Sequence, residues 1–506
     1  MGDKKNQNFY PNTIFTRRRV FSRNNTNNLC FRRGYLLMFR HCKLNIEALN
    51  LNHWNQVELG DFRIFYCPLV DITISVDADI QILMLGYAIN PFHLKIANTN
   101  QAILKYLVQE LAKSKKHFFD ALNELTGRFV LLVVQNNQAF IVQDAVGLKS
   151  CFYTQIPNEL LMSSHPGLIA ELLELKVDAL AVKISEHPKH LLGGRYLPGV
   201  MTPFKPVKQL LANTYFQINE RKVIRFFPSE VLTPNASVDE KFLKKMSMIF
   251  DQQNVLLFSR FKVALSLTAG LDSRMSLALT KNFRSQISTF TYIIWGNKSH
   301  KIDADIANEL ASRFDFHHEK ISYSRQDSHD EAHDAIARTY GGLKRSSSVN
   351  AAYFEYFPSN LINMRSNISE VFRGNWNRNP SICQGVLNLE TMLNLYKKSV
   401  KELCRDAWEE YMVVQSPLLY DHWGYDPIDM FYWEHRMSNW LALVLLDADV
   451  SHETFIHYNN RKILNEFLSI TLQDRLSDSI PKAFIDYTWP ELMDLPINPK
   501  VFPETK

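Results

Sequence analysis

The chain has 506 residues, a formal net charge of +5 and 46% hydrophobic residues. A single hydrophobic core stops growing near ~250–300 residues, so this length predicts at least two domains. The composition is typical of a globular protein, and the mild charge gives no reason to expect a nucleic-acid partner. No apolar run approaches the ~18–20 residues that a membrane-spanning helix requires, so we expect no membrane association.

Residues 1–28 are predicted to form a basic flexible tail. The run Arg17-Arg18-Arg19 is followed by a polar, asparagine-rich stretch instead of the apolar region that an export signal needs. The six cysteines form no CxxC pair, which argues against a zinc knuckle and against a redox dithiol. So few cysteines in a long chain suit a reducing compartment, and we expect a cytoplasmic protein.

Residues 29–235 are predicted to form one domain of short alternating strands with few long helices. Apolar residues at helical spacing predict a helix over 102–113. Prolines and small polar residues at 228–237 indicate the domain boundary. The candidate strands are 62–66, 80–85, 128–134 and 139–143.

Residues 236–506 show a different pattern, in which helices and buried strands alternate. Such alternation predicts a doubly wound parallel sheet, and the remainder from about 325 is expected to be mostly helical. The predicted order is a helix over 238–258, a strand over 262–267, a helix from Ser273, a strand over 287–294 and a helix over 303–314.

The segment 266–274 (SLTAGLDSR) places small residues and hydroxyls between a buried strand and a helix. Unpaired N–H groups at a helix start attract anions, and small side chains allow a phosphate to approach closely. Thr268 and Ser273 can donate to phosphate oxygens, and Asp272 can hold a magnesium ion on them. The alternative is an ordinary capped turn. The Walker lysine is missing, so this is not a P-loop of that type.

This segment resembles the PP-loop motif S-G-G-x-D-S of asparagine synthetases, with Thr268 in place of the serine and Ala269 in place of the first glycine. Segments 288–292, 305–319 and 429–458 extend the resemblance over most of 240–500. The resemblance implies an α/β, adenine nucleotide alpha hydrolase-like domain that uses ATP and Mg²⁺. Its site residues would be Asp272, Ser273 and Lys500 for catalysis, Asp272 for the metal, and Leu267, Thr268, Ala269, Gly270, Leu271, Asp272, Ser273, Arg274, Tyr292, Arg373 and Gly374 for the nucleotide.

The N-terminal half resembles class II glutaminase domains through 125–129 (LTGRF) and 144–149 (DAVGLK). That resemblance implies an N-terminal-nucleophile (Ntn) hydrolase-like sandwich of two sheets. We expect it to be degenerate, because the chain begins Met1-Gly2 and Cys30 does not lie in the family's starting sequence. The residues aligned with the glutamine clamp are Leu85, Gly86, Tyr87 and Asn100, which lack the polar groups that recognise glutamine.

The implied reaction is adenylation of a carboxylate by ATP, followed by attack of ammonia or an amine, with no glutamine hydrolysis. The acyl substrate would be a small molecule or a peptide and need not be aspartate. The family has acids in a glycine-rich loop after a later strand, whereas 371–378 (VFRGNWNR) contains none. A homodimer is compatible with the resemblance, which does not fix the oligomeric state.

Two other functions stay open. A non-catalytic binding protein with the same fold is favoured by Ala269 and by the absence of acids around Asn375. A PP-loop enzyme that modifies nucleic acid is disfavoured by the glutaminase-like half.

His329 and His333 have the spacing of a zinc motif, but Asp330 follows the first histidine, and a solvated helix is favoured. The pair His317-His318 is given no ligand role.

Overall fold

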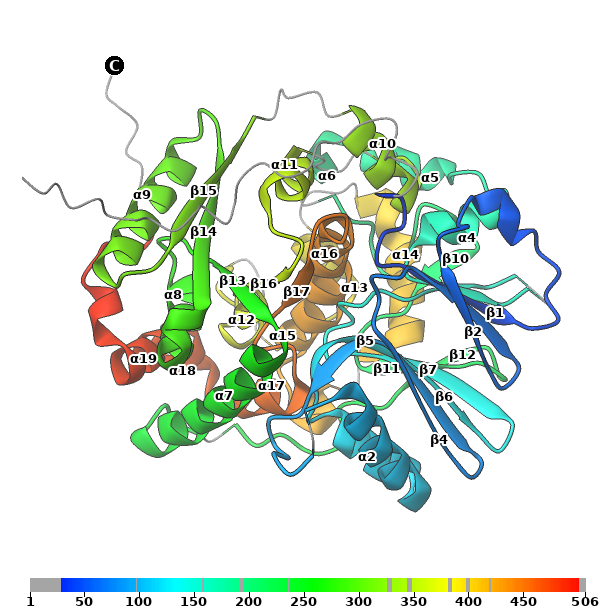
Figure 1. The fold of residues 1–506 in the computed structure, drawn as a ribbon, viewed down its shortest axis with the longest axis horizontal. Coiled ribbons are helices and arrows are strands. Elements are labelled where there is room, and N and C mark those ends of the chain that lie inside the picture. The colour runs from blue at the N-terminus through cyan, green and yellow to red at the C-terminus, as the bar shows by residue number, and fades with distance from the viewer. Residues whose placement is uncertain are drawn as a thin grey trace, which may run out of the picture.

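The computed structural model describes residues 29–96, 98–156, 159–191, 195–234, 236–324, 330–343, 348–380, 385–396, 401–417 and 420–499. The predicted tail at 1–28 therefore lies outside the described residues. Figure 1 shows two parts side by side, with the N-terminal strands on one side and a second sheet with its helices on the other. The architecture is a mixed α/β fold with a parallel sheet, as predicted.

The N-terminal part contains two six-stranded sheets whose neighbouring strands all pair antiparallel. The sheets contact each other: the ring of Tyr153 lies 4.5 Å from that of Phe216, which belongs to the other sheet. In spatial order the first sheet is β10 (Val207–Gln209), β8 (Phe152–Thr154), β9 (Leu161–Ser163), β1 (Tyr35–Phe39), β3 (Phe62–Tyr66) and β2 (Asn55–Leu59). The second is β12 (Lys222–Arg225), β11 (Thr214–Gln217), β7 (Gln138–Gln143), β6 (Thr126–Gln135), β5 (Ile80–Ile89) and β4 (Ile72–Asp77).

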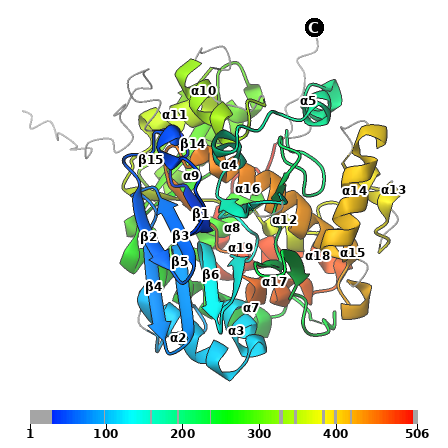
Figure 2. The ribbon, with the colours of Figure 1, turned by 90° about the vertical axis from the view of Figure 1, so that its right-hand side faces the viewer.

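The strands β5 and β6 are apolar along nearly their whole length because both of their faces are covered. Leu83 and Leu85 belong to the large core, whereas Ile82 and Met84 face a second cluster formed with α2 (Asn100–Lys113) and its neighbour. Thr99 begins α2 by accepting a hydrogen bond from the backbone of Ala102, which explains why the helix begins slightly before the predicted residue. Figure 2 shows α2 and α3 below the strands.

The second part is built on a five-stranded sheet in which every neighbouring pair is parallel. Its spatial order is β15 (His318–Tyr323), β14 (Ile287–Ile294), β13 (Lys262–Ser266), β16 (Leu361–Met364) and β17 (Glu453–Phe455). Along the chain, β14 and β15 are added on one side of β13, and β16 and β17 are then added on its other side. The doubly wound sheet is thus confirmed, and β13 and β16 form the point at which the order reverses.

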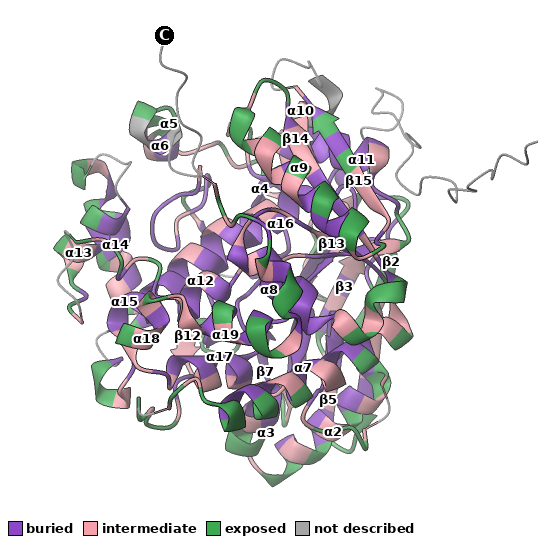
Figure 3. Cartoon of the chain, turned by 90° about the vertical axis from the view of Figure 1, so that its left-hand side faces the viewer, coloured by how far each residue is buried: buried purple, intermediate pink, exposed green. Residues whose placement is uncertain are grey.

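Helices cover the parallel sheet and fill the space toward the N-terminal part. In α9 (Lys298–Arg313) the buried residues Ala304, Ala307, Leu310 and Ala311 form one stripe, and Figure 3 shows exposed residues on its outer side. The other helices and helical turns are η1 (Ile46–Leu49), α3 (Lys115–Leu122), α4 (Pro166–Leu172), α5 (Ala179–Ser185), α6 (Pro188–Leu191), α7 (Glu240–Arg260), α8 (Leu271–Leu279), η2 (Lys281–Gln286), α10 (Asp330–Thr339), α11 (Ser348–Tyr356), α12 (Ser369–Phe372), α13 (Leu389–Leu395), α14 (Lys401–Gln415), η4 (Asp421–Trp423), α15 (Pro427–Phe431), the π-helix η5 (Tyr432–Leu441), α16 (Ala442–Ala448), α17 (Arg461–Leu468), α18 (Leu472–Leu476), α19 (Ser479–Thr488) and η6 (Pro490–Met493).

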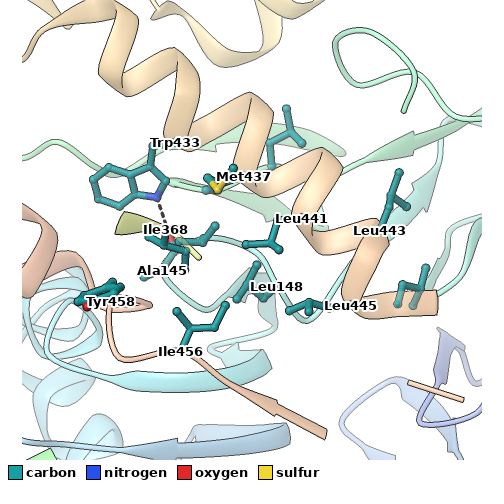
Figure 4. Packing of buried hydrophobic residues seen from close by; sticks show 14 of the residues in the cluster. Ala145, Leu148, Ile368, Trp433, Met437, Leu441, Leu443, Leu445, Ile456 and Tyr458 are labelled. Atoms are coloured by element: carbon teal, nitrogen blue, oxygen red, sulfur yellow. Dashed lines mark hydrogen bonds between the residues drawn. The ribbon is translucent and has the colours of Figure 1, made fainter. Parts of the chain in front are cut away.

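The continuous helical segment from α15 to α16 lies in the core between the two parts. Trp433 donates its indole N–H to the carbonyl of Ala145 at 3.0 Å, which joins this segment to the N-terminal half. Figure 4 shows Met437, Leu441 and Leu445 following along the same helix toward buried residues of the core. The hydrophobic core is therefore shared across the predicted boundary at 228–237.

A buried ion cluster also crosses this junction. Arg128 of β6 donates to Asp449 at 2.7 Å and to Glu453 at 2.8 Å, and it also donates to the carbonyl of Leu148 at 3.0 Å. The side chains of Arg128 and Asp449 are 1% and 2% exposed, so solvent does not screen this pair. Burial raises the pKa of Asp449, and the guanidinium of Arg128 opposes that rise.

The C-terminal segment is fixed on the parallel-sheet part by Arg274. This fully buried side chain donates to the carbonyls of Leu492 and Leu495 at 2.8 Å each and to that of Pro496 at 2.5 Å. Carbonyls of an irregular segment need donors once they are buried, and one guanidinium supplies several of them in a fixed geometry.

Replacing Arg128 by Met should lower the free energy of unfolding by about 3–5 kcal/mol, because the buried Asp449 and the partly buried Glu453 would lose this cation. Chemical denaturation would measure this loss. The control is Arg40→Met, which breaks an ion pair with Glu58 whose side chains are 52% and 36% exposed. Its expected cost is below about 1 kcal/mol, and equal costs for the two variants would contradict the buried cluster.

Replacing Arg274 by Met should speed amide hydrogen exchange in residues 489–499 by at least about tenfold, because three carbonyls lose their donor. Mass spectrometry of deuterated peptides would measure it. Arg313→Met is the matched control, since Arg313 reaches the same segment through an ion pair with the exposed Asp494 at 3.1 Å. Faster exchange in the control alone would show that Arg274 does not hold the segment.

Candidate functional site

The candidate site lies where β13 and β16 end. These two strands are neighbours in the sheet and run parallel, so the loops that follow them leave from the same edge. In open α/β sheets such an edge, at the point where the strand order reverses, is the usual place for a ligand. The predicted anion-binding segment 266–274 is one of the two loops.

The first loop passes from β13 into α8 with its side chains alternating between core and surface. Leu267, Ala269 and Leu271 are buried, so only their backbone could contact a ligand. Thr268 and Gly270 are partly exposed. Gly270 occupies the N-cap position and offers α8 no side-chain cap, which leaves the amides of the first turn for another partner.

Hydroxyl groups hold this loop in shape from within. Ser273 Oγ accepts from the amide of Thr268 at 3.1 Å and lies 3.0 Å from Thr268 Oγ1, which in turn accepts from the amide of Gly270 at 3.1 Å. Ala269 does not have a positive φ, so the alanine at this position strains nothing. A Cβ on Gly270 would lie 3.3 Å from both Asn498 Oδ1 and Thr268 Oγ1, which leaves little space for a larger residue.

An aspartate that the sequence did not suggest as a site residue contacts the loop. Asp303, within α9, accepts a hydrogen bond from the amide of Ala269 at 3.2 Å. The C-terminal segment reaches the loop as well, because the amide of Asn498 donates to the carbonyl of Ala269 at 3.3 Å. Lys500, predicted as catalytic, lies outside the described residues.

The second loop, which follows β16 and contains α12 and the segment 371–378, contributes an arginine to Asp272. Arg373 Nη1 lies 2.6 Å from each of the two carboxylate oxygens of Asp272. Ser369 Oγ donates to Asp272 Oδ1 at 2.7 Å. Arg373 was predicted to line the nucleotide, and its contact with Asp272 brings these two predicted site residues together across 101 positions of sequence.

Arg373 is fixed from a second side by Asp478, which precedes α19. Arg373 Nε and Nη2 donate to Asp478 Oδ1 at 3.0 and 2.8 Å. Arg378 donates to the same oxygen at 2.5 Å. Burial alone would lower the pKa of Arg373, but Asp272 and Asp478 raise it. Burial would likewise raise the pKa of Asp478, and its hydrogen bond with Arg373 lowers it. Both groups are therefore held in their charged forms.

Glu370 is a carboxylate of this loop that sequence reasoning missed, because it stands one residue before the segment 371–378 in which no acid is found. Its Oε2 is buried and has no hydrogen-bond partner, and its Oε1 accepts weakly from Asn367 at 3.4 Å. Burial, and then the negative charge of Asp272, raise the pKa of Glu370. The available signal was an acid close behind a short apolar strand, 361–364.

The expected magnesium site at Asp272 does not fit this arrangement. Both of its carboxylate oxygens accept from Arg373, so a cation already occupies the place that the metal would take. Among the residues that the structure describes, no three His, Cys, Asp or Glu side chains gather as metal ligands. His329 lies outside the described residues, and His318 instead lies 2.9 Å from Thr289 Oγ1.

Three other residues predicted to bind the nucleotide contact other parts of the protein. The Arg274 side chain donates to carbonyls of the C-terminal segment, and its role as a nucleotide ligand stays a prediction. Tyr292 packs its ring 6.2 Å from that of Tyr353 beside the buried residues of β14 and β15. Gly374 has a φ of +58°, and a Cβ there would lie 3.0 Å from Leu476.

The residues aligned with the glutamine site of the glutaminase domains form hydrogen bonds with other protein groups. Tyr87 is buried and donates its hydroxyl to the carbonyl of Thr454 at 2.6 Å. Asn100 is buried too, donates to the carbonyl of Gly86 at 2.9 Å and accepts from Arg260 at 3.0 Å. Cys30 is 1% exposed, and burial raises the pKa of its thiol, so it does not present a thiolate to solvent.

None of the described helices combines the length and the apolar character needed to cross a bilayer.

Comparison with known proteins gives a family for the part that carries both loops. Residues 253–375 match the model of the asparagine synthase family. A curated relative, asparagine synthetase 1 (glutamine-hydrolyzing) of Bacillus subtilis strain 168, is 23% identical over 208 residues. That match covers 40% of this chain and 32% of the relative, so the chain spans about a third of that relative's length.

Solved structures give fainter likenesses. Glutamine phosphoribosylpyrophosphate amidotransferase of B. subtilis, complexed with ADP and GMP, is 10% identical, with 69% of this chain and 73% of that chain covered and a TM-score of 0.23. The NH3-dependent NAD synthetase of Campylobacter jejuni is 16% identical, with 40% and 94% covered and a TM-score of 0.21. Scores this low carry no argument about fold or function.

The family match spans β13, the loop 266–274 and the second loop as far as Asn375, and these segments contain Asp272 and Arg373. On this domain, the protein is asparagine synthase-like.

Proposed function

We propose that the protein is an ATP-dependent amide-forming ligase that adenylates a carboxylate and transfers the acyl group to ammonia or an amine, releasing AMP and pyrophosphate. One observation carries this proposal. The strand–turn–helix loop 266–274 lies at the reversal point of the parallel sheet, within the segment that matches the asparagine synthase family. Partly exposed loop positions and uncapped amides at this edge suit the phosphates of a nucleotide.

We further propose that the N-terminal half is a degenerate glutaminase-like sandwich that serves as a structural support. Three observations favour this. Cys30 is buried, and Tyr87 is buried with its hydroxyl donated to a backbone carbonyl. Asn100 is hydrogen-bonded to a backbone carbonyl and to Arg260. The segment 144–149, which resembles a glutaminase motif, joins the two halves, since Asp144 accepts a hydrogen bond from Asn459 of the other half at 3.1 Å. Nitrogen would therefore enter as free ammonia or as an amine.

A non-catalytic nucleotide-binding protein is the second candidate. The pairing of Arg373 with Asp272 favours it, because a carboxylate already neutralised by an arginine is less available for chemistry. The two candidates differ in whether ATP is cleaved.

Exchange of labelled pyrophosphate into ATP, measured over a panel of carboxylates, separates the two. The ligase predicts exchange that depends on one class of carboxylate. Asp272→Ala should lower it by about 100-fold or more, since the charged group that fixes Arg373 is lost beside the reacting phosphates. Asp305→Ala is the control, because Asp305 lies on the surface of α9 with 50% exposure, and about twofold or less is expected. ATP binding without exchange for any carboxylate would favour the non-catalytic protein.

Cys30→Ala should leave amide formation with ammonia unchanged, and glutamine should not replace ammonia for either form of the protein. The reason is that the thiol of Cys30 is buried and contacts Arg338 at 3.2 Å, so it lacks the access of a nucleophile. Ammonia-dependent and glutamine-dependent product formation would be compared. Glutamine-dependent synthesis that Cys30→Ala abolishes would refute the proposal of an inactive glutaminase half.

A further inference from the structure

A positively charged side chain of the protein lies at the anion-binding loop. Arg373 Nη1 lies 2.6 Å from both oxygens of Asp272, which is the second residue of α8. The guanidinium group therefore lies at the N-terminus of the helix, next to the uncapped first turn. Phosphate binding at a helix N-terminus would place the ligand beside this positive charge.

The position of this charge is fixed by its surroundings. Asp478 accepts from Nε and Nη2 of Arg373, so carboxylates hold the guanidinium on two sides. The Arg373 side chain is 17% exposed, and Asp272 and Asp478 are 33% and 22% exposed. A guanidinium held by two partly buried carboxylates loses little further entropy when an anion binds.

The guanidinium keeps a donor for a ligand. Nη1 donates to both oxygens of Asp272, and Nε and Nη2 each donate once to Asp478. Nη2 carries a second N–H, which can donate to a phosphate oxygen. Arg378, which shares Asp478 but does not contact Asp272, adds positive charge behind it.

A divalent cation would have to displace this group. It would need Asp272 as a ligand, and Arg373 would then lose its main partner while remaining mostly buried, which is costly. The neighbouring acid Glu370 has one buried oxygen without a hydrogen-bond partner, and burial and the charge of Asp272 raise the pKa of this carboxyl group. Because Mg²⁺ at a nucleotide takes only one or two protein carboxylates beside the phosphates, the pairing of Asp272 with Arg373 bears directly on whether a metal binds here.

We infer that Arg373 takes the place of the divalent cation at this site, so that the protein binds the phosphates of a nucleoside triphosphate without a metal ion. The inference deepens the proposed function and rests on it for the identity of the ligand. Arg373 acts through direct contact with the phosphates, and Asp272 and Asp478 position it.

Calorimetric titration of the whole chain with ATP, in excess Mg²⁺ and separately in EDTA, tests this directly. When no metal ion is linked to binding, the dissociation constant should change by less than about threefold between the two buffers. This comparison needs only the unaltered protein, so it does not depend on the folding of any variant.

Arg373→Gly, measured in EDTA, should weaken ATP binding by about tenfold or more, because a charge-assisted contact is lost. Arg378→Gly is the matched control that removes one nearby charge while leaving Asp272 paired, and its effect should be clearly smaller. Circular dichroism and thermal melting would verify that both variants are folded. A third variant, Arg373→Lys, would retain the positive charge without the planar guanidinium group.

The possible failures are distinguishable. Binding that requires Mg²⁺ would overturn the inference about Arg373 and leave the proposed function standing. Tight binding by Arg373→Gly in EDTA would also overturn it. Absence of ATP binding in both buffers would overturn the proposed function, and the inference with it.

Discussion

The order of the strands in the parallel sheet is the constraint on which the candidate site depends. Because β13 and β16 are neighbours and point the same way, the loops behind them must leave from one edge, although 97 positions separate Ser369 from Asp272. The strand β13 is buried and apolar, which fixes where the first loop begins. The pair formed by Asp272 and Arg373 is a consequence of this topology, since neither residue has the other as a sequence neighbour.

The N-terminal half contributes to the site indirectly, through the buried junction. Arg128 holds Asp449 and Glu453, and Glu453 is the first residue of β17, the edge strand next to β16. Gly127 has a φ of +150°, and a Cβ there would lie 2.2 Å from the carbonyl of Tyr87, so close packing of two strands requires glycine. The residues that resemble a glutaminase motif therefore also have a structural use.

Sequence reasoning predicted the elements whose pattern is strong. The buried strands β13 and β14 and the helices α2 and α7 were found within a few residues because their periodicity is clear. The helix α9 begins at Lys298, earlier than the predicted 303, because Asn297 caps it by accepting from the amide of His300. The strands β16 and β17 have only four and three residues and were absorbed into a region predicted to be helical.

The residues of the site were predictable only where one motif contained them. Thr268, Gly270, Asp272 and Ser273 come from a single segment, so their spacing was informative. Asp303, Ser369, Glu370 and Asp478 come from separate elements, and no local pattern relates them to the loop. The same reason applies to the predicted magnesium at Asp272, because Arg373, which pairs with this carboxylate, lies 101 positions away and no local pattern indicates the contact.

The most direct measurement is a crystal structure of the protein with ATP and Mn²⁺, in which the anomalous signal of manganese reveals any bound metal. Arg373 should remain on Asp272 and donate to the phosphates, which should lie on the first turn of α8, with no anomalous peak at Asp272. A manganese ion coordinated by Asp272, with Arg373 displaced, or a nucleotide bound away from this edge of the sheet, would contradict the site described for this protein.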